Sequence, residues 1–83
     1  MKSYVVIGGK WFDKVNGNTY HNAKIIDTET GRAYYSGYEY GYGTQYLSSA
    51  KRYIKEELNL EEFNIIDGGS FHLKKIEVKR GQF

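Results

Sequence analysis

The stretch that decides the fold of this chain is Asn16-Gly17-Asn18-Thr19-Tyr20-His21-Asn22-Ala23-Lys24-Ile25-Ile26-Asp27. The pair Asn16-Gly17 predicts a hairpin, because a type I′ turn requires positive φ at both central residues. From Thr19 to Asp27 the residues alternate between two faces, with His21, Ala23 and Ile25 on one of them. This alternation is typical of a half-buried antiparallel strand.

The residues on either side of this stretch predict its neighbours in the sheet. Tyr4-Val5-Val6-Ile7 and Lys10-Trp11-Phe12 are rich in β-branched and aromatic side chains, which favour strands. Gly8-Gly9 separates them, and glycine within a strand indicates an interruption by a bulge or bend. After the turn from Asp27 to Gly31, the residues Arg32 to Ser36 predict a third strand. The first half of the chain is therefore expected to form a three-stranded meander.

A helix is expected in the second half of the chain. From Gln45 to Leu58 apolar residues recur at spacings of three and four, which is the pattern of one buried stripe. Three glycines before this segment break regular strand pairing, and Thr44 is placed to act as the N-cap. Asn59 follows as a residue suited to a helix end. The helix is therefore expected to pack its stripe on the sheet.

The last segment predicts a closing hairpin. We expect Phe63 to Ile66 and Ser70 to Lys79 to form two strands joined by the turn Asp67-Gly68-Gly69. The apolar residues change phase at Lys74-Lys75, which indicates a bulge. The predicted fold class is α+β: an antiparallel β-sheet in the order β-β-β-α-β-β with one amphipathic helix packed on a face. Residues 1–83 are expected to form a single small domain, because a chain of this length holds one core.

The in-phase apolar positions of these segments predict the core. Truncating Leu47 or Ile54 in the helical stripe to Ala is expected to cost about 2–5 kcal/mol. Gly43 precedes the N-cap and Gly81 belongs to a terminal tail, so Gly43→Val is expected to disturb the fold more than Gly81→Val. The residues expected to be buried are Val6, Trp11, Ile25, Leu47, Ala50, Ile54, Ile65 and Leu73.

Composition excludes several classes of site. The chain has 83 residues and no cysteine, which excludes disulfides, thiolate zinc sites and cysteine nucleophiles. Its apolar runs are far shorter than the ~18 residues of a membrane span, and no signal-peptide pattern follows Lys2. We therefore expect a soluble cytoplasmic protein without a membrane partner.

No catalytic or cofactor-binding motif is found. Gly37, Gly41 and Gly43 precede a helix, an arrangement that can bind phosphate, but they lack the Walker spacing and no lysine follows Gly43. Of the two histidines, His21 and His72, the first shares a face with apolar residues, which favours a core-edge histidine bonded to backbone over a metal ligand. No serine lies in a nucleophile-elbow motif. We expect no catalytic residue, no metal and no cofactor.

Aromatic residues make up 17% of the chain and include nine tyrosines. Tyrosine combines a large ring, few rotatable bonds and a polar tip, so it suits both a small core and a binding face. The segment from Tyr38 to Tyr42 contains three rings that follow too closely for all to be buried, so at least one is expected on the surface. The predicted partner-binding residues are Tyr38, Tyr40, Tyr42, Lys51, Arg52 and Lys55.

A second interpretation is a small nucleic-acid-binding domain. Basic residues crowd the last predicted strand, and exposed tyrosines could stack on bases between them. Against this interpretation, the chain has 12 basic and 10 acidic residues, and the acidic residues are interspersed throughout. Counterion release requires several phosphates to meet one basic patch. The residues of this alternative site are Lys74, Lys75, Lys79 and Arg80.

Two segments of the sequence carry a resemblance to known proteins. The stretch from Lys10 to Lys24, followed by Tyr40-Gly41-Tyr42-Gly43-Thr44-Gln45-Tyr46-Leu47 and Ala50, resembles small accessory proteins of bacteriophages and other bacterial mobile elements. Many proteins of this size and origin, including anti-CRISPR proteins, block a host protein or nucleoprotein by docking onto it. The resemblance therefore implies a non-enzymatic protein that acts in the bacterial host cell as a counter-defence inhibitor or another modulator of a host macromolecule.

Overall fold

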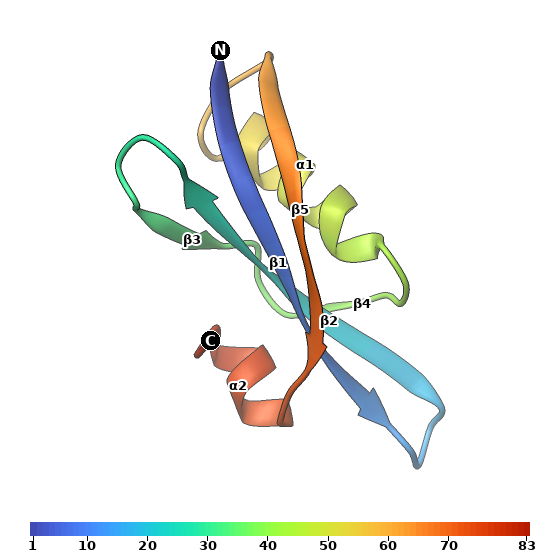
Figure 1. The fold of residues 1–83 in the computed structure, drawn as a ribbon. Helices are drawn as coiled ribbons and strands as arrows, with labels where there is room; N and C mark the ends of the chain where they lie inside the picture. Colours follow the sequence, from blue (N-terminus) through green and yellow to red (C-terminus); the bar gives the residue numbers. More distant parts are fainter.

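The computed structural model describes residues 1–83 and shows a small α+β fold in which one sheet carries two helices (Figure 1). Neither helix is long and apolar enough to cross a membrane. In chain order the elements are β1 (Lys2–Asp13), β2 (Asn18–Asp27), β3 (Ala33–Tyr35), β4 (Glu39–Tyr40), α1 (Gln45–Glu56), β5 (Phe63–His72) and α2 (Lys75–Arg80).

β1 and β2 form a long antiparallel hairpin, which confirms the prediction made from their sequence patterns. The register pairs Val6 with Ile25 and Trp11 with Tyr20. β3 and β4 both pair with the other edge of β2, at different positions along it. The order of the main strands is β3-β2-β1-β5, so β5 lies at one edge of the sheet.

β5 corrects the predicted closing hairpin. Residues Phe63–His72 form one strand that runs parallel to β1, so the sheet is mixed and not purely antiparallel. The expected turn at Asp67-Gly68-Gly69 is an irregularity within this strand, where the pairing with β1 shifts its register. Asp67 Oδ1 accepts the Gly69 N–H at 2.8 Å, and Gly69 has a φ of 94°. Where the register shifts, β5 has one residue more than β1. This extra residue forms a bulge, and the chain does not reverse.

The segment after β5 forms helix α2, where we expected the end of a strand with a bulge at Lys74-Lys75. The Lys74 N–H donates to Glu77 Oε1 at 3.1 Å at the start of α2, and Gly81 ends the helix with a φ of 64°. Val78 is the one buried residue of this helix. A helix and a strand are distinguished by the spacing between several buried residues, and one buried residue provides no spacing. The fold therefore has two helices instead of the one expected.

α1 covers one face of the sheet, as its apolar stripe predicts. Its side chains close a core with residues of β1 and β2. Thr44 precedes the helix but its side chain forms no cap hydrogen bond, whereas Asn59 adopts the expected left-handed conformation with a φ of 55°. Of the expected core residues, four are fully buried: Val6, Ile25, Ala50 and Ile54. The other four are only partly buried: Trp11, Leu47, Ile65 and Leu73. The remaining core positions are Tyr4, Ala23 and Tyr46.

Gly8-Gly9 does not interrupt β1, which corrects the expected break. A Cβ atom at Gly8 would lie 2.6 Å from the ring of Tyr46, and one at Gly9 would lie 2.8 Å from the ring of Phe83. Neighbouring residues of a strand face opposite sides of the sheet. Tyr46 belongs to α1 and Phe83 follows α2, so the two glycines allow a ring from each helical layer to pack directly on the strand.

The hairpin turn between β1 and β2 differs in type from the prediction. Gly17 has a φ of 68°, but Asn16 does not have a positive φ. The turn is organised by Asp13, whose Oδ1 accepts the N–H groups of Val15 and Asn16 at 3.0 and 3.3 Å. The turn therefore has one left-handed residue, Gly17, and is held by the Asp13 carboxylate, whereas a type I′ turn requires two left-handed residues.

The C-terminal tail is held in place, which reverses the expected order of the two glycine substitutions. Gly43 and Gly81 have φ values of 61° and 64°, but only at Gly81 would a Cβ atom meet a neighbour, the Tyr35 ring at 2.8 Å. The Tyr35 hydroxyl donates to the carbonyl oxygen of Phe83 at 2.6 Å, and the two rings pack edge to face. A side chain at Gly81 would therefore disturb a packed contact, whereas one at Gly43 would point into open space.

Candidate functional site

The structure divides the predicted partner-binding residues between the two faces of the sheet. Glu39 and Tyr40 are consecutive residues of β4, so their side chains face opposite sides. Glu39 forms an ion pair with Arg52 of α1, whereas Tyr40 contacts Tyr20 on the face that carries α2. Tyr42 is exposed in the loop before α1. Lys51, Arg52 and Lys55 lie together around an open hollow of about 360 Å³ on α1.

Four aromatic side chains, which we call the aromatic row, contact one another on the α2 face: Trp11, Tyr20, Tyr38 and Tyr40. The Tyr20 ring stacks with that of Trp11 at 5.9 Å and with that of Tyr38 at 5.1 Å between centroids. Tyr40 meets Tyr20 in an edge arrangement at 5.8 Å, with the ring planes at 72°. The register explains the row, because Tyr20 pairs with Trp11 across one side of β2 and with Tyr40 across the other.

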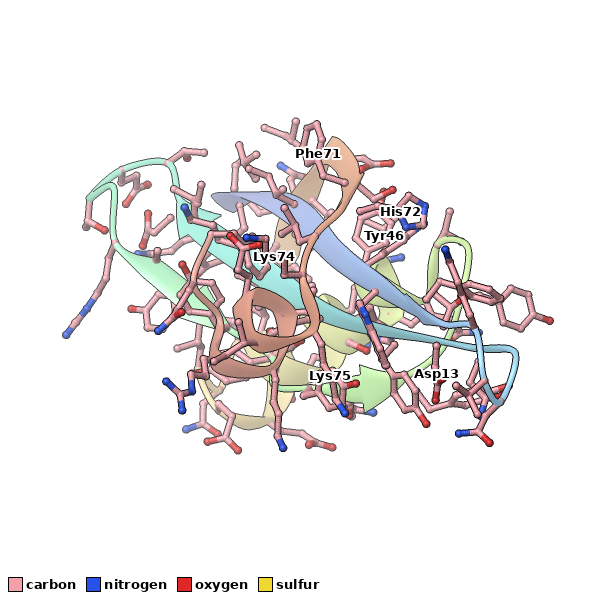
Figure 2. All side chains as sticks on the ribbon, turned by 90° about the horizontal axis from the view of Figure 1, so that it is seen from below. Asp13, Tyr46, Phe71, His72, Lys74 and Lys75 are labelled. Atoms are coloured by element: carbon pink, nitrogen blue, oxygen red, sulfur yellow. The ribbon has the colours of Figure 1, made fainter.

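The residues of the alternative nucleic-acid site lie beside this row; we call them the basic cluster: Lys74, Lys75, Lys79 and Arg80. The Lys75 Nζ atom lies 5.1 Å from the centre of the Trp11 ring, within cation–π range. Lys75, Lys79 and Arg80 also line a hollow of about 500 Å³. Figure 2 shows Lys74 and Lys75 at the start of α2. The helix, in place of the expected strand, gathers these cations within two turns.

Asn22 holds in place both α2 and the segment that carries Tyr38 and Tyr40. The sequence pattern did not predict this role, because it places Asn22 on the polar face of the strand. Its side chain is buried, because α2 covers the side of the sheet that we expected to be open. The Asn22 Nδ2 atom donates to the carbonyl oxygen of Val78 in α2 at 2.9 Å, and Oδ1 accepts the Gly37 N–H at 3.1 Å. One amide therefore ties α2 to the segment that carries Tyr38 and Tyr40.

On the opposite face, His21 is a buried histidine bonded to backbone, as expected. Its Nδ1 atom lies 3.2 Å from the carbonyl oxygen of Gly41, and Nε2 lies 2.7 Å from Ser49 Oγ. Ser49 in turn donates to Glu39 Oε2 at 2.6 Å. Burial acts to raise the pKa of Glu39, but the hydrogen bonds from Ser49 and Arg52 outweigh it and leave the pKa lowered. The carboxylate lies on the serine and not on Nδ1, so the order differs from a Ser-His-Asp relay.

A second polar contact links α1 to β5. The Tyr46 hydroxyl donates to Asp67 Oδ1 at 2.7 Å, and burial together with this carboxylate raises the pKa of Tyr46 to about 12. The same hydrogen bond and the Gly69 N–H lower the pKa of Asp67. Lys10 Nζ lies 5.5 Å from the centre of the Tyr46 ring. These groups satisfy one another and hold the bulge of β5 against α1.

No group of three or more His, Cys, Asp or Glu side chains is placed so that it could hold a metal ion. His72 is exposed and lies two strands away from His21, with Lys10 of β1 between them in the register. A comparison of the chain with protein-family models, with curated proteins and with solved structures finds no match.

Proposed function

We propose that this protein is a non-enzymatic binding module that docks onto a macromolecule through the aromatic row. The observation that supports this function best is the continuous contact of four aromatic rings on one face of the sheet. Their rings are only partly buried, and that of Tyr40 is 61% exposed. Exposed rings that do not serve the core are available to a partner.

The geometry of the row suits binding because its side chains are already ordered. Tyrosine and tryptophan are enriched among the residues that dominate binding energies. Mutual stacking restricts the rotamers of Trp11, Tyr20 and Tyr38 before a partner arrives. Less conformational entropy is then lost on association, which strengthens binding for a given contact area.

The resemblance to accessory proteins of bacteriophages and mobile elements supports the setting of this proposal. In that setting the partner is a macromolecule of the bacterial host, and binding modulates it, as counter-defence inhibitors do. This part of the proposal rests on the segments Lys10 to Lys24 and Tyr40 to Ala50.

Two exposed tyrosines of the same segment provide a matched test. Tyr40 and Tyr42 are 61% and 69% exposed, but only Tyr40 belongs to the aromatic row. The chain is immobilised, bacterial lysate is passed over it, and the captured protein and nucleic acid are quantified for each variant. Tyr40→Ala is expected to weaken capture about thirtyfold, the equivalent of about 2 kcal/mol, and Tyr42→Ala to leave it unchanged. Unchanged capture by a folded Tyr40→Ala variant would exclude the row as the interface.

A further inference from the structure

The four cations of the basic cluster take part in no ion pair. The ion pairs of the structure involve Lys2, His21 and Arg52, and none of them includes a residue of the basic cluster. Glu77, the one acidic residue of α2, accepts the Lys74 N–H. The four cations outnumber this one carboxylate, so the cluster presents a net positive charge on the surface, which attracts an anionic ligand.

Asp13, the acidic side chain of the β1–β2 turn, forms no ion pair with the basic cluster. The pKa of Asp13 is lowered, first by the hydrogen bond from the Asn16 side chain and also by the N–H groups of the turn and the charge of Lys75. Asp13 Oδ2 accepts Asn16 Nδ2 at 2.9 Å, and Oδ1 accepts two backbone N–H groups. Its oxygens are thus held by the turn, and Lys75 lies instead over the Trp11 ring.

At the end of the aromatic row away from Lys75, two rings each have a face that no other ring covers. Tyr20 is stacked between Trp11 and Tyr38, so Tyr40 meets its edge and not its face. The outward faces of Tyr38 and Tyr40 are then free of other rings. From Lys75 to Tyr40 the surface runs through successive contacts of 5.1, 5.9 and 5.8 Å, so one continuous strip has cations at one end and free ring faces at the other.

We infer that this strip binds single-stranded nucleic acid, a conclusion that rests on the proposed function of the aromatic row. Phosphates are held by the basic cluster, and unpaired bases stack on Tyr38 and Tyr40. A nucleic-acid strand provides both an anion and a planar ring at each residue, and this combination matches cations next to aromatic faces. A duplex offers the phosphates but keeps its bases inside the stack, so it fits only half of the strip.

The experiment uses fluorescein-labelled oligothymidylate of about 12 nucleotides, a length within the site sizes of single-strand-binding folds, and a duplex of the same length. Binding is followed by fluorescence anisotropy over a range of salt concentrations. The single strand is expected to bind more tightly than the duplex. Tyr40→Ala is expected to weaken single-strand binding by roughly fivefold to 150-fold, the range found for loss of one stacked base.

A pair of double variants tests the charges. Lys79→Gln with Arg80→Gln removes two cations from the basic cluster, and Lys51→Gln with Lys55→Gln removes two from the outer side of α1. The net charge changes equally, so only position differs. The first pair is expected to reduce the slope of log K against log salt by about 1.4, because each phosphate contact on a single strand contributes about 0.7. The second pair is expected to leave the slope unchanged.

Thermal melting of each variant shows that it is folded, and Lys75→Gln repeats the charge test at the start of α2 if the double variant unfolds. Equal binding of single strand and duplex, equal slopes for the two double variants, or an unchanged affinity of Tyr40→Ala would overturn the inference. A different outcome is that no oligonucleotide binds, but Tyr40→Ala still weakens the capture of a protein from lysate that has been treated with nuclease. In that case the nucleic-acid inference fails and the proposed function of the row stands.

Discussion

Replacing Asn22 by leucine tests whether a single buried amide holds α2 on the sheet. Leucine has a similar size, so the change removes the two hydrogen bonds, to the Val78 carbonyl at 2.9 Å and from the Gly37 N–H at 3.1 Å, without a large cavity. Leaving a buried polar group without its partner costs about 1–3 kcal/mol. Gly37 is only half-buried, so water can replace its lost partner, and most of the cost comes from the buried Val78. We therefore expect a loss of about 1–3 kcal/mol.

Urea unfolding measures this loss, and hydrogen exchange locates it. The amides of α2 are expected to lose protection in Asn22→Leu, while those of α1 keep theirs relative to global unfolding, because α1 packs on the other face. Asn64→Leu is the control, since Asn64 is exposed on β5 and its side chain forms no hydrogen bond. If Asn22→Leu unfolds at the same urea concentration as Asn64→Leu and α2 stays protected, the amide does not anchor the helix.

Three further substitutions test the packing and the charges of the fold. Gly81→Val is expected to lower the melting temperature more than Gly43→Val, because only at Gly81 would a side chain strike a ring; equal melting temperatures would contradict this. Ile54→Ala is expected to cost about 2–5 kcal/mol in urea unfolding, and a cost below about 1 kcal/mol would show that its site is not packed. The hydrogen bond from Lys2 lowers the pKa of Asp27 from its ordinary value of 3.8, so the stability that it contributes is present above that value and is lost as the pH falls through the folded pKa. Asp27→Asn should therefore flatten the acid limb of the stability profile, and an unchanged limb would show that Asp27 does not contribute.

The β1–β2 hairpin and α1 could be predicted because their patterns are long and local. Alternation over nine residues fixed which side chains of β2 face the core, and the buried His21, Ala23 and Ile25 confirm it. The stripe of α1 repeats over about three turns, which is enough to identify the buried Ala50 and Ile54. In both cases neighbours in the sequence decide the structure.

β5 and α2 could not be predicted because distant contacts decide them. The segment Asp67-Gly68-Gly69 has the composition of a turn, but the Tyr46 hydroxyl, from another element, bonds the Asp67 carboxylate while the strand continues past it. In the same way, α2 is held by Asn22 of β2 and by the packing of Phe83 on Gly9. Asn22 and the glycines of these contacts lie in segments far apart in the sequence, so they form no periodic pattern that would predict β5 or α2.

The candidate surface arises from both kinds of information. The sequence places Tyr38 and Tyr40 in one segment and the basic cluster in another, and it offers no reason to join them. The register of β2 brings Tyr40 next to Tyr20, and α2 brings Lys75 over Trp11, so that two alternative predicted sites become neighbours on one face. The α1 cations Lys51 and Lys55, first grouped with the tyrosines, lie on the other side of the sheet. The surface is thus joined by strand register and by the position of a short helix, and a variant that detaches α2, such as Asn22→Leu, should separate its aromatic part from its basic part.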